Sequence, residues 1–212
     1  MKRIHAFALG MVSLAVAAGS FACGDYVTDK LVERQGDETP GYPVGEFHRP
    51  GQQCSACHGQ NGSAKPEFTV SGTIFSGPQS LVGVDSVEVQ MTDAVGTRYI
   101  AKTNCVGNFF VKPDEWSPKF PILVRIKKGF TAVQMQSPIG REGSCAGCHK
   151  AKPLTQAESR SSMPHVQLFG GDEPPSTGSS DGGVCPVDAS VPGFPAAASV
   201  SETPTDTPPE SP

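Results

Sequence analysis

Two short stretches of the chain carry residue types that can do chemistry together, and they share one spacing. Residues 54–58 are Cys-Ser-Ala-Cys-His, and residues 145–149 are Cys-Ala-Gly-Cys-His. Two thiols at this spacing can add to the two vinyl groups of one porphyrin, and the adjacent histidine then lies against the iron. The repeat therefore predicts two covalently bound c-type haems, attached at Cys54, Cys57, Cys145 and Cys148.

The histidine of each motif, His58 or His149, is the expected proximal iron ligand. Outside the motifs and the N-terminal segment that holds His5, two histidines remain, His48 and His165, and each lies near one motif in sequence, so two irons have two spare imidazoles. We predict these as distal ligands, with the pairing of histidine to haem open. The alternative is that both are surface histidines and that Met163 or water completes each iron. Bis-histidine iron has no open position, which favours an electron carrier over an enzyme.

A second chemistry is open to the same four cysteines. Two C-x-x-C pairs can bind one zinc ion, or each pair can close a small disulfide. Zinc does not need a histidine directly after the second cysteine in both copies. The pattern therefore favours haem over zinc or disulfides.

The N-terminus has the features of an export signal. Lys2 and Arg3 precede an apolar run over residues 6–18 that ends in small residues, too short for a spanning helix. We expect residues 1–22 to be a signal peptide and Cys23, which follows a lipobox-like sequence, to be lipidated. The alternative is plain secretion. The predicted location is the cell envelope, anchored by lipid to the inner or outer membrane, with residues 23–45 as a tether.

Charge and cysteine usage limit the partners and the compartment. The formal charge is −4, and it becomes −6 when Lys2 and Arg3 leave with the signal peptide. An acidic chain without a basic block argues against nucleic-acid binding and favours a redox protein partner with a basic face. Cys105 and Cys185 remain outside the motifs. In an oxidising compartment they either pair as a disulfide or stay as two free thiols.

The middle of the chain has a β pattern with a period of two residues. Apolar and polar side chains alternate, and Gly or Pro clusters separate most of the segments. The expected strands are 68–74, 87–92, 97–103, 109–112, 122–127 and 131–136. This predicts a mainly β fold, with a small antiparallel β-sandwich over 67–137. Short irregular or helical haem-binding segments over 46–66 and 138–169 flank it, and 170–212 has the composition of a disordered tail.

Two resemblances follow from these residues. The motifs resemble those of c-type cytochromes. Residues 70–75, 84–96 and 103–109 resemble the carboxypeptidase regulatory-like, or prealbumin-like, domain, which implies an interaction module without catalytic residues. Together they predict a dihaem c-type cytochrome lipoprotein that carries single electrons and is not an enzyme. The alternative is an adhesin-like or scaffold lipoprotein whose C-x-x-C pairs form disulfides or bind zinc.

Overall fold

The computed structural model describes residues 25–38, 40–77, 80, 82–150, 163, 166–168 and 185. The expected signal peptide, the lipidation site Cys23, the distal histidine His165 and nearly all of the expected tail lie outside these residues. Within the described part, no helix is long and apolar enough to cross a membrane.

The described chain is mainly β, with six strands in two antiparallel sheets. The strands are β1 (Val70–Thr73), β2 (Glu88–Thr92), β3 (Arg98–Lys102), β4 (Asn108–Val111), β5 (Leu123–Lys128) and β6 (Thr131–Gln134). All six match segments that the alternating pattern predicts. Three short helical elements accompany them: α2 (Tyr26–Gln35), α3 (Ser55–His58) and the 3-10 turn η1 (Cys145–Gly147).

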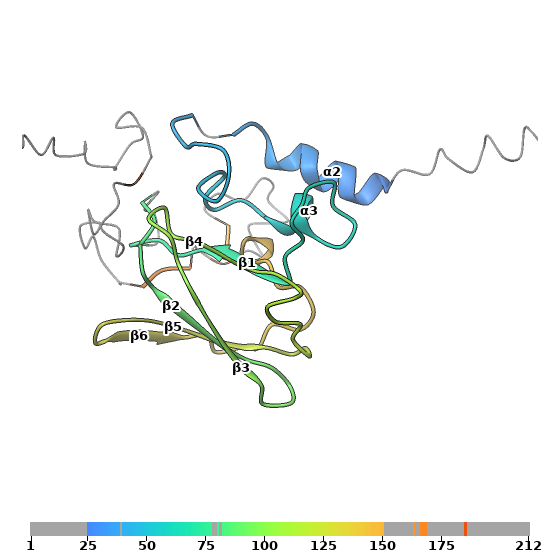
Figure 1. The fold of residues 1–212 in the computed structure, drawn as a ribbon. Coiled ribbons are helices and arrows are strands. Elements are labelled where there is room, and N and C mark those ends of the chain that lie inside the picture. The colour runs from blue at the N-terminus through green and yellow to red at the C-terminus, as the bar shows by residue number, and fades with distance from the viewer. Residues whose placement is uncertain are drawn as a thin grey trace, which may run out of the picture.

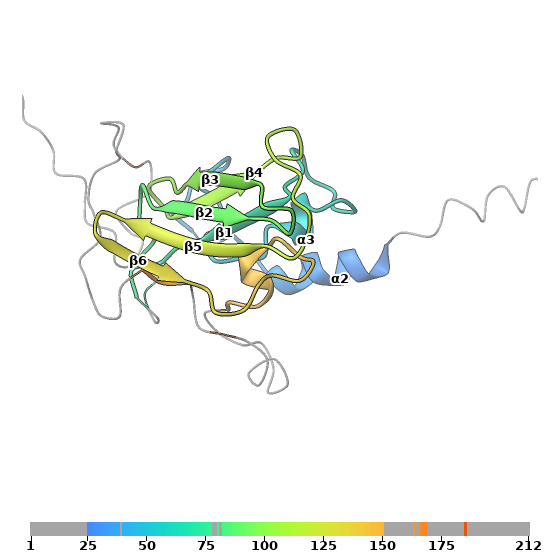
Figure 2. The ribbon, with the colours of Figure 1, turned by 90° about the horizontal axis from the view of Figure 1, so that it is seen from below.

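The strands are not joined as a simple up-and-down meander. β1 and β4 pair with each other in a two-stranded sheet, called the ribbon below, while the other four form a sheet in the order β3-β2-β5-β6 (Figure 2). The chain therefore crosses between the sheets from β1 to β2, from β3 to β4 and from β4 to β5, whereas β2–β3 and β5–β6 are neighbours within one sheet. In Figure 1 the ribbon forms a middle layer, with α2 and α3 on one side and the four-stranded sheet on the other.

Side chains from both sheets form one apolar core. The inward-facing residues of β2, Val89 and Met91, are almost fully buried, as are Val70 and Val111 of the ribbon. The loop residue Trp116 also belongs to this core, where its ring stacks on Tyr99 at 5.5 Å. Trp116 thus packs the β domain and does not line either of the cavities described below.

The turn into β4 depends on a glycine. Gly107 has a φ of +80°, and a Cβ there would lie 2.4 Å from the carbonyl oxygen of Ile74. The side chain of Asn104 closes the same turn by accepting hydrogen bonds from the backbone N–H groups of Val106 and Asn108. This turn places β4 beside β1, which creates the ribbon.

Candidate cofactor sites

The two Cys-x-x-Cys-His motifs adopt the same local backbone turn. In the first, the N–H of His58 donates to the carbonyl of Cys54 at 2.8 Å, and in the second the N–H of His149 donates to the carbonyl of Cys145 at 2.8 Å. A helical turn brings side chains three and four positions apart to one side. In each motif both cysteines and the histidine accordingly line one cavity.

The first cavity lies on the α3 side of the ribbon and has a volume of about 590 Å³. This lies within the roughly 300–1,000 Å³ that is typical of small-molecule and cofactor sites. Its walls combine the first motif, the loop before it and the outer face of the ribbon. They include Cys54, Cys57, His58, His48, Phe68 and Phe110.

His58 is held firmly in this cavity. Its Nδ1 is 2.7 Å from the carbonyl oxygen of Pro66, and its ring stacks on Phe68 with centroids 4.5 Å apart. Phe68 in turn stacks on Phe110 of β4 at 4.9 Å. The ribbon therefore fixes the plane of the His58 imidazole through two aromatic rings.

His48 faces His58 from the opposite wall of the first cavity. The two ring centroids lie 5.9 Å apart with an interplanar angle of 51°. Metal to imidazole-nitrogen bonds are about 2 Å long, so a metal ion held between two imidazoles separates their centroids by roughly 6 Å. The observed separation suits two axial ligands of one iron.

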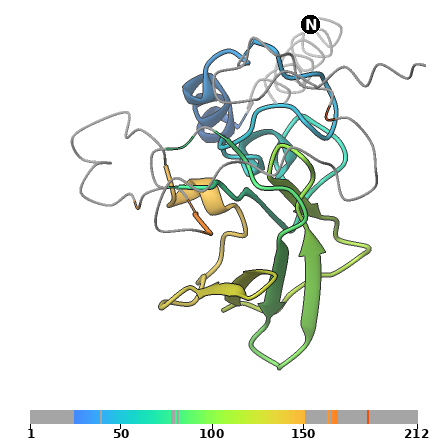
Figure 3. The same cartoon turned by 90° about the vertical axis from the view of Figure 1, so that its left-hand side faces the viewer.

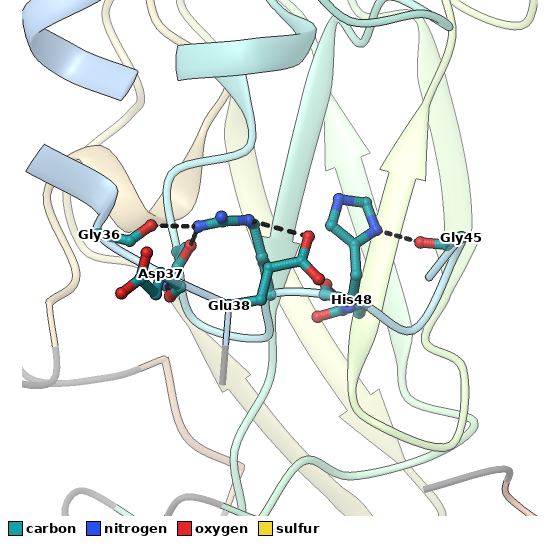
Figure 4. Close-up of polar contacts among 8 residues, drawn as sticks. Gly36, Asp37, Glu38, Gly45 and His48 are labelled. Carbon is teal, nitrogen blue, oxygen red and sulfur yellow. Dashed lines mark hydrogen bonds and ion pairs between the residues drawn. The ribbon is translucent and has the colours of Figure 1, made fainter. Parts of the chain in front are cut away.

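Both imidazoles present the same nitrogen to the cavity. The Nδ1 of His48 hydrogen-bonds to the carbonyl of Gly45 (Figure 4), as the Nδ1 of His58 does to that of Pro66. A carbonyl oxygen only accepts, so Nδ1 carries the proton in each ring and Nε2 keeps the lone pair that a metal needs. Metal-ligating histidines commonly donate their other N–H in this way.

Two cations line the first cavity. Arg49 and Lys65 both contribute to its wall, and the Arg49 guanidinium lies 3.3 Å from a carboxylate oxygen of Glu38 and 2.8 Å from the carbonyl of Gly36. Arg49 has a φ of +50°, an uncommon conformation for a residue with a side chain. Cations at this position suit the two propionate carboxylates of a haem.

The second cavity, of about 390 Å³, lies on the other side of the ribbon. Residues of β5 and β6, on the inner face of the four-stranded sheet, line this cavity. That wall is largely apolar, formed by Val124, Ile126, Val133 and Met135. The sheet thus supplies the apolar surface that the sequence around the second motif lacks.

Two buried polar atoms in the second cavity have no partner within the described part of the chain. They are the hydroxyl oxygen of Ser144 and the side-chain oxygen of Gln167. Buried polar atoms are normally hydrogen-bonded, so an unpaired one points to a missing partner. The Ser144 hydroxyl can donate to a carboxylate, such as a propionate group of a haem, whereas the unpaired atom of Gln167 is an oxygen and needs a donor.

His165, the predicted distal ligand near the second motif, lies outside the described residues, but residues near it in sequence are described. Met163 and Val166 both line the second cavity. Met163 pairs with the second motif through its backbone, since its N–H donates to the carbonyl of Cys148 at 2.9 Å. This pairing sets Met163 directly beside His149, and Met163 lines the same cavity, so the alternative of a methionine ligand stays open.

A glutamate joins the two motif segments. One carboxylate oxygen of Glu142 accepts hydrogen bonds from Ser55 Oγ at 2.7 Å and from Gln53 Nε2 at 2.6 Å. The same oxygen would lie 3.3 Å from a Cβ on Gly147, inside the second motif. Although the two motifs are far apart in sequence, the fold brings them together.

The first cysteines of the two motifs lie against neighbouring residues of β1. The Ser71 hydroxyl lies near the sulfur of Cys54, where it opposes the effect of burial on the pKa of that thiol, and the sulfur of Cys145 lies against Gly72. Burial raises the pKa of the Cys54 thiol and raises that of the Cys145 thiol to about 12. Both thiols are therefore protonated at neutral pH.

The other cysteine prediction concerned Cys105 and Cys185, which the structure joins by a disulfide with a Cα–Cα distance of 5.7 Å. The four motif cysteines are free thiols. Among the residues that the structure describes, no three His, Cys, Asp or Glu side chains form a group able to hold a metal ion.

Sequence reasoning missed three contributors to these sites. Phe68 and Phe110 fall on a strand pattern, which predicts packing but not stacking on His58. Glu142 stands in a polar loop, and its position shortly before the second motif was the one available signal.

Comparison with protein-family models, with curated proteins and with solved structures found no match for this chain. The resemblances to c-type cytochromes and to the carboxypeptidase regulatory-like domain therefore rest on the residues alone and stay predictions.

Proposed function

We propose that this chain is a membrane-anchored dihaem c-type cytochrome that carries single electrons in the cell envelope. The observation that supports this most strongly is the pairing of motif and cavity: each Cys-x-x-Cys-His turn lines its own cavity. His48 and His58, at 5.9 Å, add a ready pair of axial ligands in the first. The β region then acts as a small sandwich that carries both haem-binding segments.

Each residue has a defined role in this proposal. Cys54 and Cys57 hold the first haem, Cys145 and Cys148 hold the second, and His58 and His149 are the proximal ligands. His48 shares a cavity with His58, so it serves the first haem, which leaves His165 for the second. When bound, each haem supplies an iron that accepts and releases one electron. The protein holds it, orients the imidazoles and excludes water, and we propose no catalytic role.

The second candidate is an adhesin-like or scaffold lipoprotein in which the cysteine pairs only staple the chain or bind zinc. Zinc or disulfides do not need cavities of 390 and 590 Å³ beside each motif, nor imidazoles facing one another. The free state of the motif thiols beside a formed Cys105–Cys185 disulfide also favours the haem proposal.

The test is a haem stoichiometry and an optical spectrum of the mature protein, made in cells with the haem-attachment machinery. Two covalent haems with low-spin spectra support the proposal. Protein without haem and with all six non-lipid cysteines oxidised would favour the scaffold. For the anchor, a Cys23→Ser variant should move from the membrane to the soluble fraction, and a variant that stays on the membrane would contradict lipidation at Cys23.

A further inference from the structure

The ribbon separates the two candidate haem sites, because adjacent residues of a strand point to opposite faces. On one face, Thr73 Oγ1 accepts a hydrogen bond from the N–H of Gly51 at 2.7 Å, and Asn108 Nδ2 donates to the carbonyl of His48 at 3.1 Å. This face carries the first site. Gly72 and Phe109, which pair with each other across the ribbon, point to the other face.

The second motif comes unusually close to the ribbon at Gly72. A Cβ on Gly72 would lie 2.7 Å from the sulfur of Cys145, 2.8 Å from its Cβ and 3.0 Å from the ring of Phe109. Real Cβ atoms essentially never come closer than 3.0 Å to another heavy atom. Only glycine therefore lets Cys145 occupy this position. Phe109 is also the one described residue with an aromatic ring that lines both cavities.

The attachment points of the two haems thus straddle a single strand. Cys54 lies near Ser71, and Cys145 packs on Gly72, the next residue of β1. Glu142 further ties the two segments together at this end of the ribbon by accepting from Ser55.

We infer that the β1–β4 ribbon separates two closely spaced haems. Gly72 and Phe109 are positioning residues that set the distance between the two haems, and the electron path from one haem to the other runs through them. This rests on the proposed function. The transfer takes one electron from a ferrous iron to a ferric iron, so it needs no proton, bond change or further reactant. Figure 3 shows the ribbon between the first motif segment and the four-stranded sheet in a second view.

Closely spaced redox sites should affect each other. A charge gained at one iron acts on the other through a poorly screened interior, so the two do not titrate independently. Two haems separated by one strand should also couple optically, which splits the circular dichroism signal of the main haem absorption band.

The experiment compares the haem-loaded wild type with Gly72→Ala and Gly140→Ala. A Cβ on Gly140 meets no atom within 4 Å, so Gly140→Ala is a matched control in the segment before the second motif. We expect two haems and a split dichroism band for the wild type and for Gly140→Ala. For Gly72→Ala we expect loss of the splitting, with or without loss of the haem at Cys145 and Cys148, as mapped by peptide mass.

The failures are distinguishable. Wild type without covalent haem would overturn the proposed function. Wild type with two haems but an unsplit band, or Gly72→Ala with two haems and an unchanged splitting, would overturn the inference alone. If Gly72→Ala fails to fold, Phe109→Leu is the test variant. It keeps Gly72 and replaces the aromatic ring that lines both cavities by a smaller side chain. An unchanged splitting in Phe109→Leu would then contradict the inference, and a changed one would support it.

Discussion

The imidazole rings of His48 and His58 lie 5.9 Å apart across the first cavity, each with its Nδ1 on a backbone carbonyl. This arrangement fixes both tautomers before any metal arrives. Asn108 holds the backbone of His48, and the Phe68–Phe110 stack holds the ring of His58. Both histidines are therefore oriented by the ribbon, which makes the first site the more completely defined of the two.

Removing one distal ligand should free the sixth coordination position of one iron and leave the other iron six-coordinate. We expect His48→Ala to bind carbon monoxide in the reduced state at one haem of the two, because the first iron loses its sixth ligand. His165→Ala should open the other iron, and the double variant both. The measurement is the carbon monoxide difference spectrum, scaled to total haem. Retained low-spin spectra in both single variants would contradict the ligand assignment.

Glu142 should stabilise the association of the two motif segments. Glu142→Ala removes the acceptor of two hydrogen bonds, and each is worth about 1 kcal/mol at a partly solvated site, so the free energy of unfolding should fall by about 1–2 kcal/mol. Glu142→Gln keeps a carbonyl acceptor and should lose less. The measurement is urea denaturation of the haem-loaded protein, with Arg141→Ala as a neighbouring exposed control. A Glu142→Ala variant as stable as this control would contradict the role.

Thiol reactivity should differ within the second motif of protein made without haem. Burial raises the pKa of Cys145 to about 12, whereas Cys148 is exposed. At pH 8 we expect iodoacetamide to modify Cys148 far faster than Cys145, since the thiolate is the nucleophile. The difference between the two modification rates should become smaller as the pH rises toward 12. Equal rates at pH 8, followed by peptide mass, would contradict the burial of Cys145.

The raised pKa of the Cys145 thiol also predicts how the stability of the haem-free protein changes with pH. In the unfolded chain a cysteine ionises near about pH 8.5, whereas Cys145 in the fold stays protonated to a higher pH. The unfolded state therefore releases the proton first, and the stability of the haem-free protein should fall as the pH rises above about 8.5. Thermal unfolding between pH 7 and pH 10 measures this. Haem-loaded protein, with Cys145 in a thioether, should lack this contribution.

The number of thiols that a reductant releases should distinguish the two candidate functions. In a haem-loaded chain the four motif cysteines are thioethers, so a reductant should free two thiols, from Cys105 and Cys185. If all three pairs were disulfides, six thiols would appear. A Cys105→Ser/Cys185→Ser variant should lose about 2–4 kcal/mol of stability, because the bond closes a long loop. Thiol titration under denaturing conditions, before and after reduction, gives the count.

Much of the β region follows from local sequence. Strict alternation, as at Val87, Val89 and Met91, predicts a strand with one buried face, and all six expected strands are present. The pairing of β1 with β4 could not be predicted in this way, because no local residue pattern selects a partner 35–41 residues away. That pairing depends on the Asn104–Gly107 turn and on burial of Phe109 and Val70 in a shared core.

The candidate sites likewise have some features that the sequence predicts and others that only the folded structure shows. The motifs and the nearness of His48 to Cys54 are visible in sequence, and the structure places His48 opposite His58. The contact of Cys145 with Gly72 and the link from Glu142 to Ser55 are not visible, because each joins segments that only the folded topology brings together. An alternating strand pattern predicts which face Gly72 takes but not what approaches it.

The most direct test of the central claim is the intact mass of the mature protein, with the attachment sites mapped by peptide mass. The proposal predicts a chain heavier than its lipidated sequence by two haems, one on Cys54 and Cys57 and one on Cys145 and Cys148. A mass with no haem, from cells whose haem-attachment machinery loads a known c-type cytochrome in parallel, would contradict it.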